Sequence, residues 1–414
     1  TEEAVFVVPG KETLNSLLHE VSQTSQRAPT AVQQLYNAVI ANNFQITSSS
    51  SASTNVLTAK YYNVIARLSS YERNAPTLMF VAYYDSHSAV PSLSVGADSN
   101  GSGIAALLEL LAIFQRFYTN PSNRPKFNMI FLLSAGGKFN YQGSRQFLDD
   151  YLEKQTDEHI ELVICLDALG RENNLFAHVS KFPPEGSASA KLFERLKIFS
   201  NDKHKVDLVT KKINLGNEWL AWEHEIYNIR RMPAMTLSHF EKFTDPRRNS
   251  MLDTLASVDV EVLSTNVHIL ANSVLAYIFD LDIDACQNLE HPDQRCSLLE
   301  AKDVNRARLQ GFLEAFGGNP RPMATTSLKL VKELAETAQK YSTGRVVQQE
   351  VLLVDLQLYG VLEDKLIAHI VKPSVFELLL AAGIGAYMYS LYYLAQNAQL
   401  ILETAVVRLR KMVS

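Results

Sequence analysis

The feature that most limits how this chain can fold is a long stretch near its C-terminus without a charged side chain. Residues 378–402 contain no Asp, Glu, Lys or Arg. About 20 apolar residues in a helix span the hydrocarbon core of a bilayer, so this stretch predicts one transmembrane helix at residues 374–402. The alternative is a core helix that is buried on every face.

Charged residues on either side of the stretch predict its orientation. The sequence RLRK follows it at residues 408–411, whereas only Lys372 closely precedes it. Basic residues accumulate on the cytoplasmic side of membrane proteins, so we expect residues 403–414 to form a cytoplasmic basic tail. The large domain is then expected in a lumen or outside the cell. Tyr, Gln and Asn side chains give the span a polar face that suits contact with another membrane helix.

Residues 45–284 alternate between strand-like and helix-like patterns. Continuous apolar runs at 77–85, 127–135 and 161–170 predict buried strands, and the apolar spacing at 103–118 predicts a helix between two of them. Such strands are typical of parallel sheets that helices cover on both faces. The sequence therefore predicts a three-layer α/β/α body with a mostly parallel, mixed sheet.

Two further segments differ in character from this body. Residues 285–373 carry helical patterns and predict a smaller helical connector between the body and the span, on the same side of the membrane as the body. Residues 1–44 begin with Thr1 rather than Met and open on a strand-like run. We expect them to be the remnant of a larger N-terminal region.

Charge and cysteine content narrow the possible functions. The net charge is -5, and no long basic run occurs outside the extreme C-terminus, so nucleic-acid binding has no electrostatic support. Cys286 and Cys296 flank a polar loop that a disulfide can close if this domain lies outside the cytoplasm. Two free thiols are the alternative, and the sequence leaves both open. No cysteine pattern resembles a zinc site.

Several loops that follow predicted strands carry recognisable motifs. They read YYDS at residues 83–86, GADSNGSG at 96–103, QGS at 142–144 and LDALG at 166–170. Loops at the carboxyl ends of such strands are expected to lie together. The motifs resemble the zinc-aminopeptidase superfamily, which includes transferrin-receptor-like and nicastrin-like proteins. With GGKFNYQGS, LAWEHE and the C-terminal span, nearly the whole chain resembles the nicalin family, nicastrin-like proteins of the endoplasmic reticulum membrane.

The resemblance implies where catalytic groups would stand. Active members hold two metal ions with two His and three carboxylates, and a Glu acts as general base. The six matching positions here are Tyr83, Asp98, Gly136, Gly137, Asp167 and Asn249, while Asp85 shapes its turn. Only the two Asp are retained among the six. Glycine offers no ligand or base, and tyrosine, with a pKa near 10, is a poor ligand at neutral pH. The resemblance therefore implies a non-catalytic body without metal or cofactor.

Other residues near these motifs raise additional hypotheses. Two carboxylates without metal repel each other, so Lys138 or another basic group is expected to replace the metal charge; a solvated loop lysine is the alternative. His87 or His239 can supply a ligand in an active enzyme, or be surface or structural residues. Asn100 begins a glycosylation sequon, NGS, at the mouth of the site. An unmodified Asn in a glycine-rich loop is the alternative.

The family resemblance implies a scaffold of the endoplasmic reticulum membrane. Proteins of that family are understood to assemble with Nodal modulator and a multipass membrane protein at the translocon, where they assist the biogenesis of multipass membrane proteins. An active metallo-aminopeptidase with substituted ligands is a second hypothesis. A third is a receptor for free amino termini or peptides, with Trp219, Trp222 and the EHE sequence at 223–225 lining its cleft. The alternative is that these tryptophans lie on a helix face that packs in the core.

Overall fold

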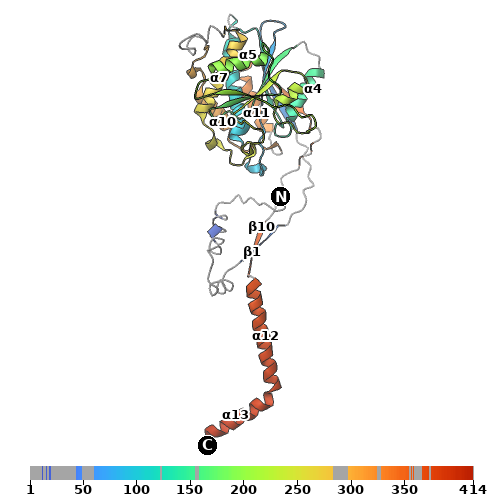
Figure 1. Ribbon diagram of the computed structural model, residues 1–414, viewed down its shortest axis with the longest axis vertical. Helices are drawn as coiled ribbons and strands as arrows, with labels where there is room; N and C mark the ends of the chain where they lie inside the picture. The colour runs from blue at the N-terminus through green and yellow to red at the C-terminus, as the bar shows by residue number, and fades with distance from the viewer. Residues whose placement is uncertain are drawn as a thin grey trace. The chain divides into compact units, whose positions relative to one another are not determined.

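The computed structural model describes residues 43–48, 60–121, 124–153, 158–282, 297–323, 328–353, 366–372 and 374–413, with a few single residues outside these ranges. The chain divides into two compact units. The larger unit spans residues 55–360, and the smaller combines residues 1–54 with 361–414. Figure 1 traces the chain from its N-terminus to its C-terminus.

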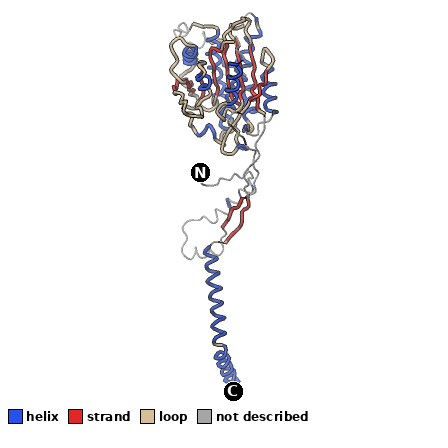
Figure 2. Tube along the Cα trace, turned by 90° about the vertical axis from the view of Figure 1, so that its right-hand side faces the viewer, coloured by secondary structure: helices blue, strands red, loops and turns tan. Residues whose placement is uncertain are grey.

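An eight-stranded mixed sheet forms the centre of the larger unit (Figure 2), with the strand order β7-β6-β8-β5-β3-β4-β2-β9. The strands β8, β5, β3 and β4 run parallel to one another, β6 and β7 run parallel to each other, and the remaining pairings are antiparallel. Their bounds are β2 Tyr61–Leu68, β3 Thr77–Tyr83, β4 Asn128–Ser134, β5 Ile160–Leu166, β6 Leu175–Val179, β7 Val206–Thr210, β8 Ala234–Ser238 and β9 Val347–Val351.

Helices cover both faces of this sheet. Alternate side chains of β3 show why, since Leu78 and Phe80 enter one apolar cluster while Met79 and Val81 enter the other. The first face is covered by α3 (Gly103–Thr119), α5 (Ala188–Phe199), α7 (Val260–Ile278), α10 (Arg306–Gly317) and α11 (Leu328–Gln339), and the second by α4 (Gln142–Glu153) and α6 (His224–Ile229). The predicted three-layer architecture is confirmed.

Short helical turns connect these elements. They are η1 (Pro91–Leu93), η2 (Ala97–Ser102), η4 (Pro246–Asn249), η5 (Leu255–Ser257) and η6 (Ala301–Asp303). Two of them, η2 and η4, lie in the loops that carry the motif residues. Their tight turns direct side chains of these loops towards the edge of the sheet.

Residues 297–351 belong to the body, and their assignment to a separate helical connector is wrong. Strand β9 pairs with β2 in the sheet, and α10 packs against α3. Glu109 of α3 is fully buried, and Arg308 of α10 donates to both of its carboxylate oxygens at 2.7 Å. Helical periodicity predicted an apolar face but gave no indication of what that face covers.

The smaller unit contains a two-stranded sheet and two helices. Strand β1 (Asn43–Ser48) pairs antiparallel with β10 (Leu366–Val371), a segment predicted to be at least partly helical. Helix α12 spans Ser374–Gln396, and α13 spans Ala398–Val413, so the expected basic tail is helical to Val413. Among the described residues one helix, Phe376–Gln396, is long and apolar enough to cross a membrane.

The cysteines are only partly described. Cys165 lies buried in β5 as a free thiol, in agreement with its apolar sequence context. Cys286 and Cys296 lie outside the described residues, so the disulfide stays a prediction.

Candidate functional site

The motif residues come together at one edge of the sheet. The parallel strands β8, β5, β3 and β4 all end at this edge, where ligand sites form in open α/β sheets. Tyr83 ends β3, and its hydroxyl donates to Asp167, which follows β5, at 2.7 Å. The amide of Gly170 donates to Asp98 Oδ1 at 2.9 Å. The predicted meeting of these loops is confirmed.

Asp167 is surrounded by donors from the protein itself. The Tyr83 hydroxyl and Arg248 Nη2, at 3.2 Å, share Oδ1, and the Ser238 hydroxyl donates to Oδ2 at 3.0 Å. Burial acts to raise the pKa of Asp167, but the charges of Arg248 and Lys138 outweigh it and hold that pKa below its ordinary range. Burial and the Asp167 charge raise the pKa of Tyr83, so its hydroxyl keeps the proton it donates.

Asp98 has a separate set of partners. His239, which follows β8, places Nε2 2.5 Å from Oδ2, so this ring nitrogen donates to the carboxylate. The Gly170 amide and the Ser102 hydroxyl, at 3.2 Å, donate to Oδ1. His239 and Asp98 are both almost fully buried. Both carboxylate oxygens of Asp98 therefore accept from protein donors.

Asp85 holds the turn at Gly136 and Gly137, where the resemblance implies a pair of glutamates in active members. Its Oδ1 accepts from the Gly137 amide at 2.6 Å and its Oδ2 from the Lys138 amide at 2.9 Å. Burial raises the pKa of Asp85, and these two backbone bonds oppose the rise. Gly136 has φ 67°, in the left-handed region that favours glycine. The expectation that Asp85 shapes its turn is supported by these contacts.

Tyr83 and Gly137 are sterically coupled. A Cβ atom added at Gly137 would lie 2.0 Å from Tyr83 Cγ and 2.3 Å from Tyr83 Cβ. Carbon atoms normally approach no closer than about 3.5 Å. The tyrosine therefore fills the volume that a side chain at position 137 would need. The tyrosine at position 83 and the glycine at position 137 therefore belong to one packing arrangement.

Lys138 points into this region but does not form an ion pair with either retained carboxylate in the described chain. Its Nζ donates to Ser99 Oγ at 2.8 Å and to the Arg248 carbonyl at 2.7 Å, and it lies 5.5 Å from the centre of the Tyr83 ring. Burial and the charge of Arg248 lower the pKa of Lys138 to about 8. The direct partner of Asp167 is Arg248, so Lys138 has at most a supporting part in replacing the metal charge.

Position 249 does not reach the site. Asn249 is exposed at the end of η4, whereas the preceding residue, Arg248, is buried and carries its guanidinium over the Trp222 ring at 4.4 Å. Sequence reasoning missed Arg248, because it placed the inward-facing position one residue too late. Of the two additional histidines, His87 is exposed beside Phe139, and His239 enters the centre.

Arg321, which lies in the segment expected to be a connector, also supports the site. Arg321 is buried, and its side chain donates to the carbonyls of Tyr84 at 2.9 Å and Gly96 at 3.0 Å. It thereby ties the loop after β3 to the turn that precedes Asp98. Burial lowers the pKa of Arg321 to about 10.

The residues expected to line a cleft for amino termini are mostly buried. Trp222, Glu223 and Glu225 are each at most 2% exposed. Glu223 accepts from the hydroxyls of Ser144 at 2.6 Å and Ser134 at 3.1 Å, and burial raises its pKa to about 7. This part of that hypothesis is wrong. Trp219 differs, since it is 57% exposed.

Asn100 does not have the accessibility that glycosylation requires. Its side chain is fully buried in η2, and neither amide atom has a hydrogen-bond partner among the described residues. Its backbone has φ 89°, which asparagine tolerates better than most residues. A glycan on Nδ2 has no room in this packing of the folded chain, which favours the alternative of an unmodified Asn100; glycosylation itself stays a prediction.

The residues present do not fit a pair of zinc ions. Zinc needs about four ligands, and active sites of this kind use His and carboxylate side chains. Within the described residues, no group of three or more His, Cys, Asp or Glu is arranged to hold a metal. The positive guanidinium of Arg248 also lies 3.2 Å from Asp167, where a cation would be repelled.

Comparison with known proteins first gives the class. Residues 63–274 match the model of Peptidase family M28, whose fold agrees with the three-layer body. A crystal structure of the gamma-secretase component nicastrin aligns with a TM-score of 0.50 at 11% identity, covering 76% of this chain and 63% of that chain. This likeness shows the fold alone.

Curated relatives then give the family. Nicalin from Caenorhabditis elegans is 41% identical over 433 residues, which cover 99% of this chain and 76% of the relative. The human protein named BOS complex subunit NCLN is 33% identical over 404 residues, which cover 93% of this chain and 70% of the relative. The chain belongs to the nicalin family of M28-type proteins.

Proposed function

We propose that this chain is a non-catalytic subunit of a multi-protein complex in the endoplasmic reticulum membrane. Its M28-type body binds partner proteins, and α12 anchors it. Relatives named as BOS complex subunits support membership of a complex. The length and apolar character of Phe376–Gln396 support the anchor.

The observation that carries the non-catalytic part is the donor set around Asp167. Tyr83, Ser238 and Arg248 use both carboxylate oxygens, and Arg248 supplies the positive charge. A hydrolase of this class needs that carboxylate to bind a metal and needs a general base nearby. The resemblance places that base at position 136, where glycine has no side chain, and position 137 cannot carry the neighbouring ligand while Tyr83 fills its side-chain volume.

The proposed topology follows the charges around α12. The body is lumenal, and α13 with its basic residues is cytoplasmic. We infer from the family resemblance that the partners are a Nodal modulator-like lumenal protein and a multipass membrane protein, in an assembly at the translocon. This assembly then assists the biogenesis of multipass membrane proteins.

Metal content and peptidase activity test the non-catalytic part. The full chain, purified in mild detergent without chelators, is expected to contain no stoichiometric zinc and to leave aminoacyl p-nitroanilides uncleaved, even with added zinc. The alternative, an active metallo-aminopeptidase, predicts about two zinc ions per chain. It also predicts turnover that Asp167→Ala abolishes. Either of these results would refute the proposed loss of catalysis.

Co-purification tests the scaffold part. The full chain is expected to retain a multipass membrane protein and a lumenal protein in mild detergent. A matched control replaces α12 with an unrelated apolar helix of the same length, which keeps the anchor but removes the specific face. Loss of the multipass partner alone in this control would assign that contact to α12. Recovery of chaperones alone from the unmodified chain would contradict the scaffold function.

A further inference from the structure

A pocket of about 510 Å³ opens beside the turn that carries Gly136 and Gly137. It is bounded by the turn itself with Phe139, by α4 with Arg145, by the loop before α6 with Trp219, and by residues after β9 with Leu352 and Leu356. All of these lie in the larger unit. The volume falls within the range of pockets that hold small ligands.

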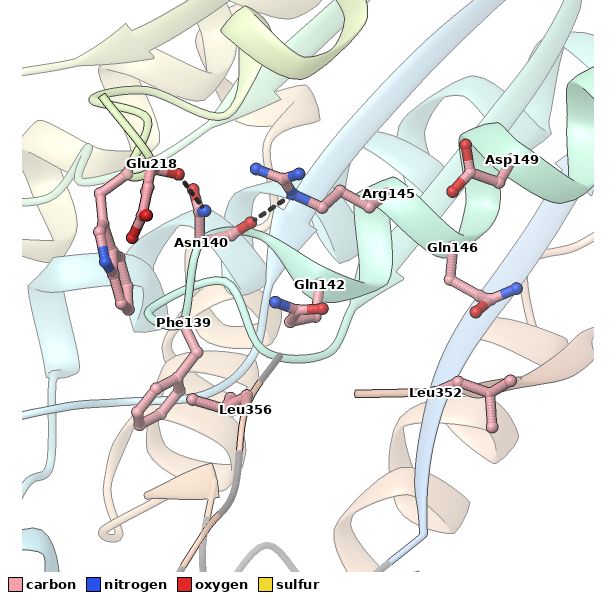
Figure 3. A pocket seen from close by; sticks show the side chains of 10 residues that line it. Phe139, Asn140, Gln142, Arg145, Gln146, Asp149, Glu218, Leu352 and Leu356 are labelled. Carbon is pink, nitrogen blue, oxygen red and sulfur yellow. Dashed lines mark hydrogen bonds between the residues drawn. The ribbon is translucent and has the colours of Figure 1, made fainter. Parts of the chain in front are cut away.

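Apolar side chains form much of the pocket wall. Figure 3 shows Phe139 and Leu356 facing each other at one end, with Leu352 beyond them. Trp219 is 57% exposed and Leu352 is 65% exposed. Large apolar side chains that stand in water around a concave site release that water when an apolar group enters. The pocket therefore favours a ligand with an aromatic or aliphatic side chain.

Arg145 adds a positive charge to this wall. Its Nε donates to the Asn140 carbonyl at 3.0 Å, as the dashed line in Figure 3 marks, and this bond fixes the guanidinium. Its two terminal nitrogens have no hydrogen-bond or ion-pair partner among the described residues. Asp149, on the next turn of α4, also lines the pocket and acts electrostatically on Arg145, but its ion pair is with Arg230 at 3.3 Å. A fixed arginine with two available nitrogens is suited to a carboxylate, which it holds in a bidentate manner.

We propose that this pocket binds the C-terminal residue of an extended peptide that ends in an aromatic or aliphatic side chain. The terminal carboxylate lies on Arg145, and the side chain packs among Phe139, Trp219 and Leu356. The pocket is small, so the carboxylate and the apolar group must be close together in the ligand. A chain terminus has both on one Cα atom, whereas an internal acidic residue supplies its carboxylate on a side chain of its own.

Glu218 also lines the pocket, but it does not cancel this charge preference. Its side chain is exposed, so water and salt screen its charge. Its main-chain carbonyl accepts from Asn140 Nδ2 at 2.7 Å, which helps to hold the loop that carries Trp219. This peptide site goes beyond the proposed scaffold function, because it is present whether or not the chain assembles with membrane partners.

Tryptophan fluorescence provides the test. The chain has two tryptophans, of which Trp219 is exposed and Trp222 is 1% exposed. The full chain in detergent is titrated with the peptide acid acetyl-Ala-Leu-Phe and with its C-terminal amide. The acid is expected to shift the emission of Trp219 to the blue and protect it from acrylamide. The amide is expected to bind at least about tenfold more weakly, because it loses a charge-assisted pair.

Variants assign the effect to the pocket. Arg145→Gln is expected to remove the preference for the acid over the amide, whereas Phe139→Ala weakens both peptides by a similar factor and leaves their ratio unchanged. Arg306→Gln is the matched control, since it removes an exposed arginine that pairs with Glu261 and does not line the pocket, and it is expected to change neither. Thermal melting checks that each variant folds. If Arg145→Gln fails to fold, the ratio of acid to amide binding in the unmodified chain still decides.

Three results would overturn the proposal. Equal binding of the peptide acid and its amide would show that the pocket does not recognise the terminal carboxylate. Absence of any fluorescence response at millimolar peptide acid would show that the pocket does not bind the peptide. Tighter binding of acetyl-Asp-Phe-amide than of the peptide acid would assign the arginine to an acidic side chain instead of a chain terminus. None of these results depends on metal content or on co-purification, so failure here is distinct from failure of the scaffold function.

Discussion

Replacing Arg248 with methionine tests whether a protein cation has taken over the charge of a missing metal. The substitution keeps much of the apolar stem and removes the only positive charge in contact with Asp167 in the described chain. Asp167 keeps its bonds from Tyr83 and Ser238 but is left as a buried carboxylate without a counter-charge in contact, and only the more distant charge of Lys138 still opposes the effect of burial. Removing one partner of a buried ion pair costs about 3–5 kcal/mol. We expect a loss of this size at neutral pH.

The pH dependence gives the sign of the effect. In the unmodified chain the pKa of Asp167 is lowered, so its contribution to stability is complete above its unfolded pKa of about 3.9 and is lost as pH falls towards the folded value. Without Arg248, burial is left to raise that pKa above the unfolded value. The Arg248→Met variant is then expected to lose stability as pH rises from about 4 towards neutrality. Adding Asp167→Asn should recover most of the loss at neutral pH.

The assay is urea unfolding of the detergent-solubilised full chain, followed by circular dichroism at pH 4.5 and pH 7.5. Arg247→Met is the matched control, because its side chain is 44% exposed and pairs with Glu172, which is 43% exposed, and Asp245, which is 22% exposed. Surface pairs contribute up to about 1 kcal/mol, so this variant should be nearly neutral at both pH values. The reasoning is refuted if Arg248→Met costs the same at both pH values and Asp167→Asn recovers nothing.

Three further predictions concern neighbouring features. Gly137→Ala should destabilise the chain by about 3 kcal/mol or more, because the added Cβ overlaps with Tyr83. The control Gly311→Ala, where an added Cβ meets nothing within 4 Å, should stabilise α10 slightly. Equal melting temperatures of the two variants would contradict this prediction. Because burial raises the pKa of Glu223 to about 7, folding favours its protonated form, and the free energy of unfolding falls as pH rises from about 4.5 to 7. Glu223→Gln should flatten this fall, and an unchanged pH profile of stability would count against the prediction. Treatment with peptide N-glycosidase should leave the electrophoretic mobility of the cell-derived chain unchanged, and a shift that Asn100→Gln removes would show that the burial of Asn100 does not prevent modification.

Much of the fold was predictable because its signals are local. The continuous apolar run in β3 and the apolar spacing in α3 identify a buried strand and a covering helix without any knowledge of the rest of the chain. Strand β6, only five residues long, carried too little pattern to be found. Helix propensity alone favours a helix that begins at Glu218, yet α6 starts at His224, because Asn140 and Glu225 hold the backbone amides of Leu220 and Ala221 in a loop.

The site was predictable where residue identity alone decides the chemistry. Glycines at 136 and 137 and a tyrosine at 83 exclude the usual ligands in any conformation. Geometry was not predictable in the same way. Whether position 248 or 249 faces inward depends on the turn η4, and the overlap between Tyr83 and Gly137 depends on backbone distances. Arg321 was missed because its contacts lie more than 200 residues away in sequence.

The pairing of β9 with β2 has a consequence for how the chain is made. Ribosomes release residues in order, so β2 leaves the ribosome early and presents one unsatisfied row of amides and carbonyls until β9 arrives near the end of synthesis. Such an open margin invites association with other nascent polypeptides. Because α12 follows soon after β9, the sheet is completed at about the time the anchor itself is delivered. A chain truncated before residue 347 would therefore have an incomplete sheet that is prone to association, and it would lack the membrane anchor.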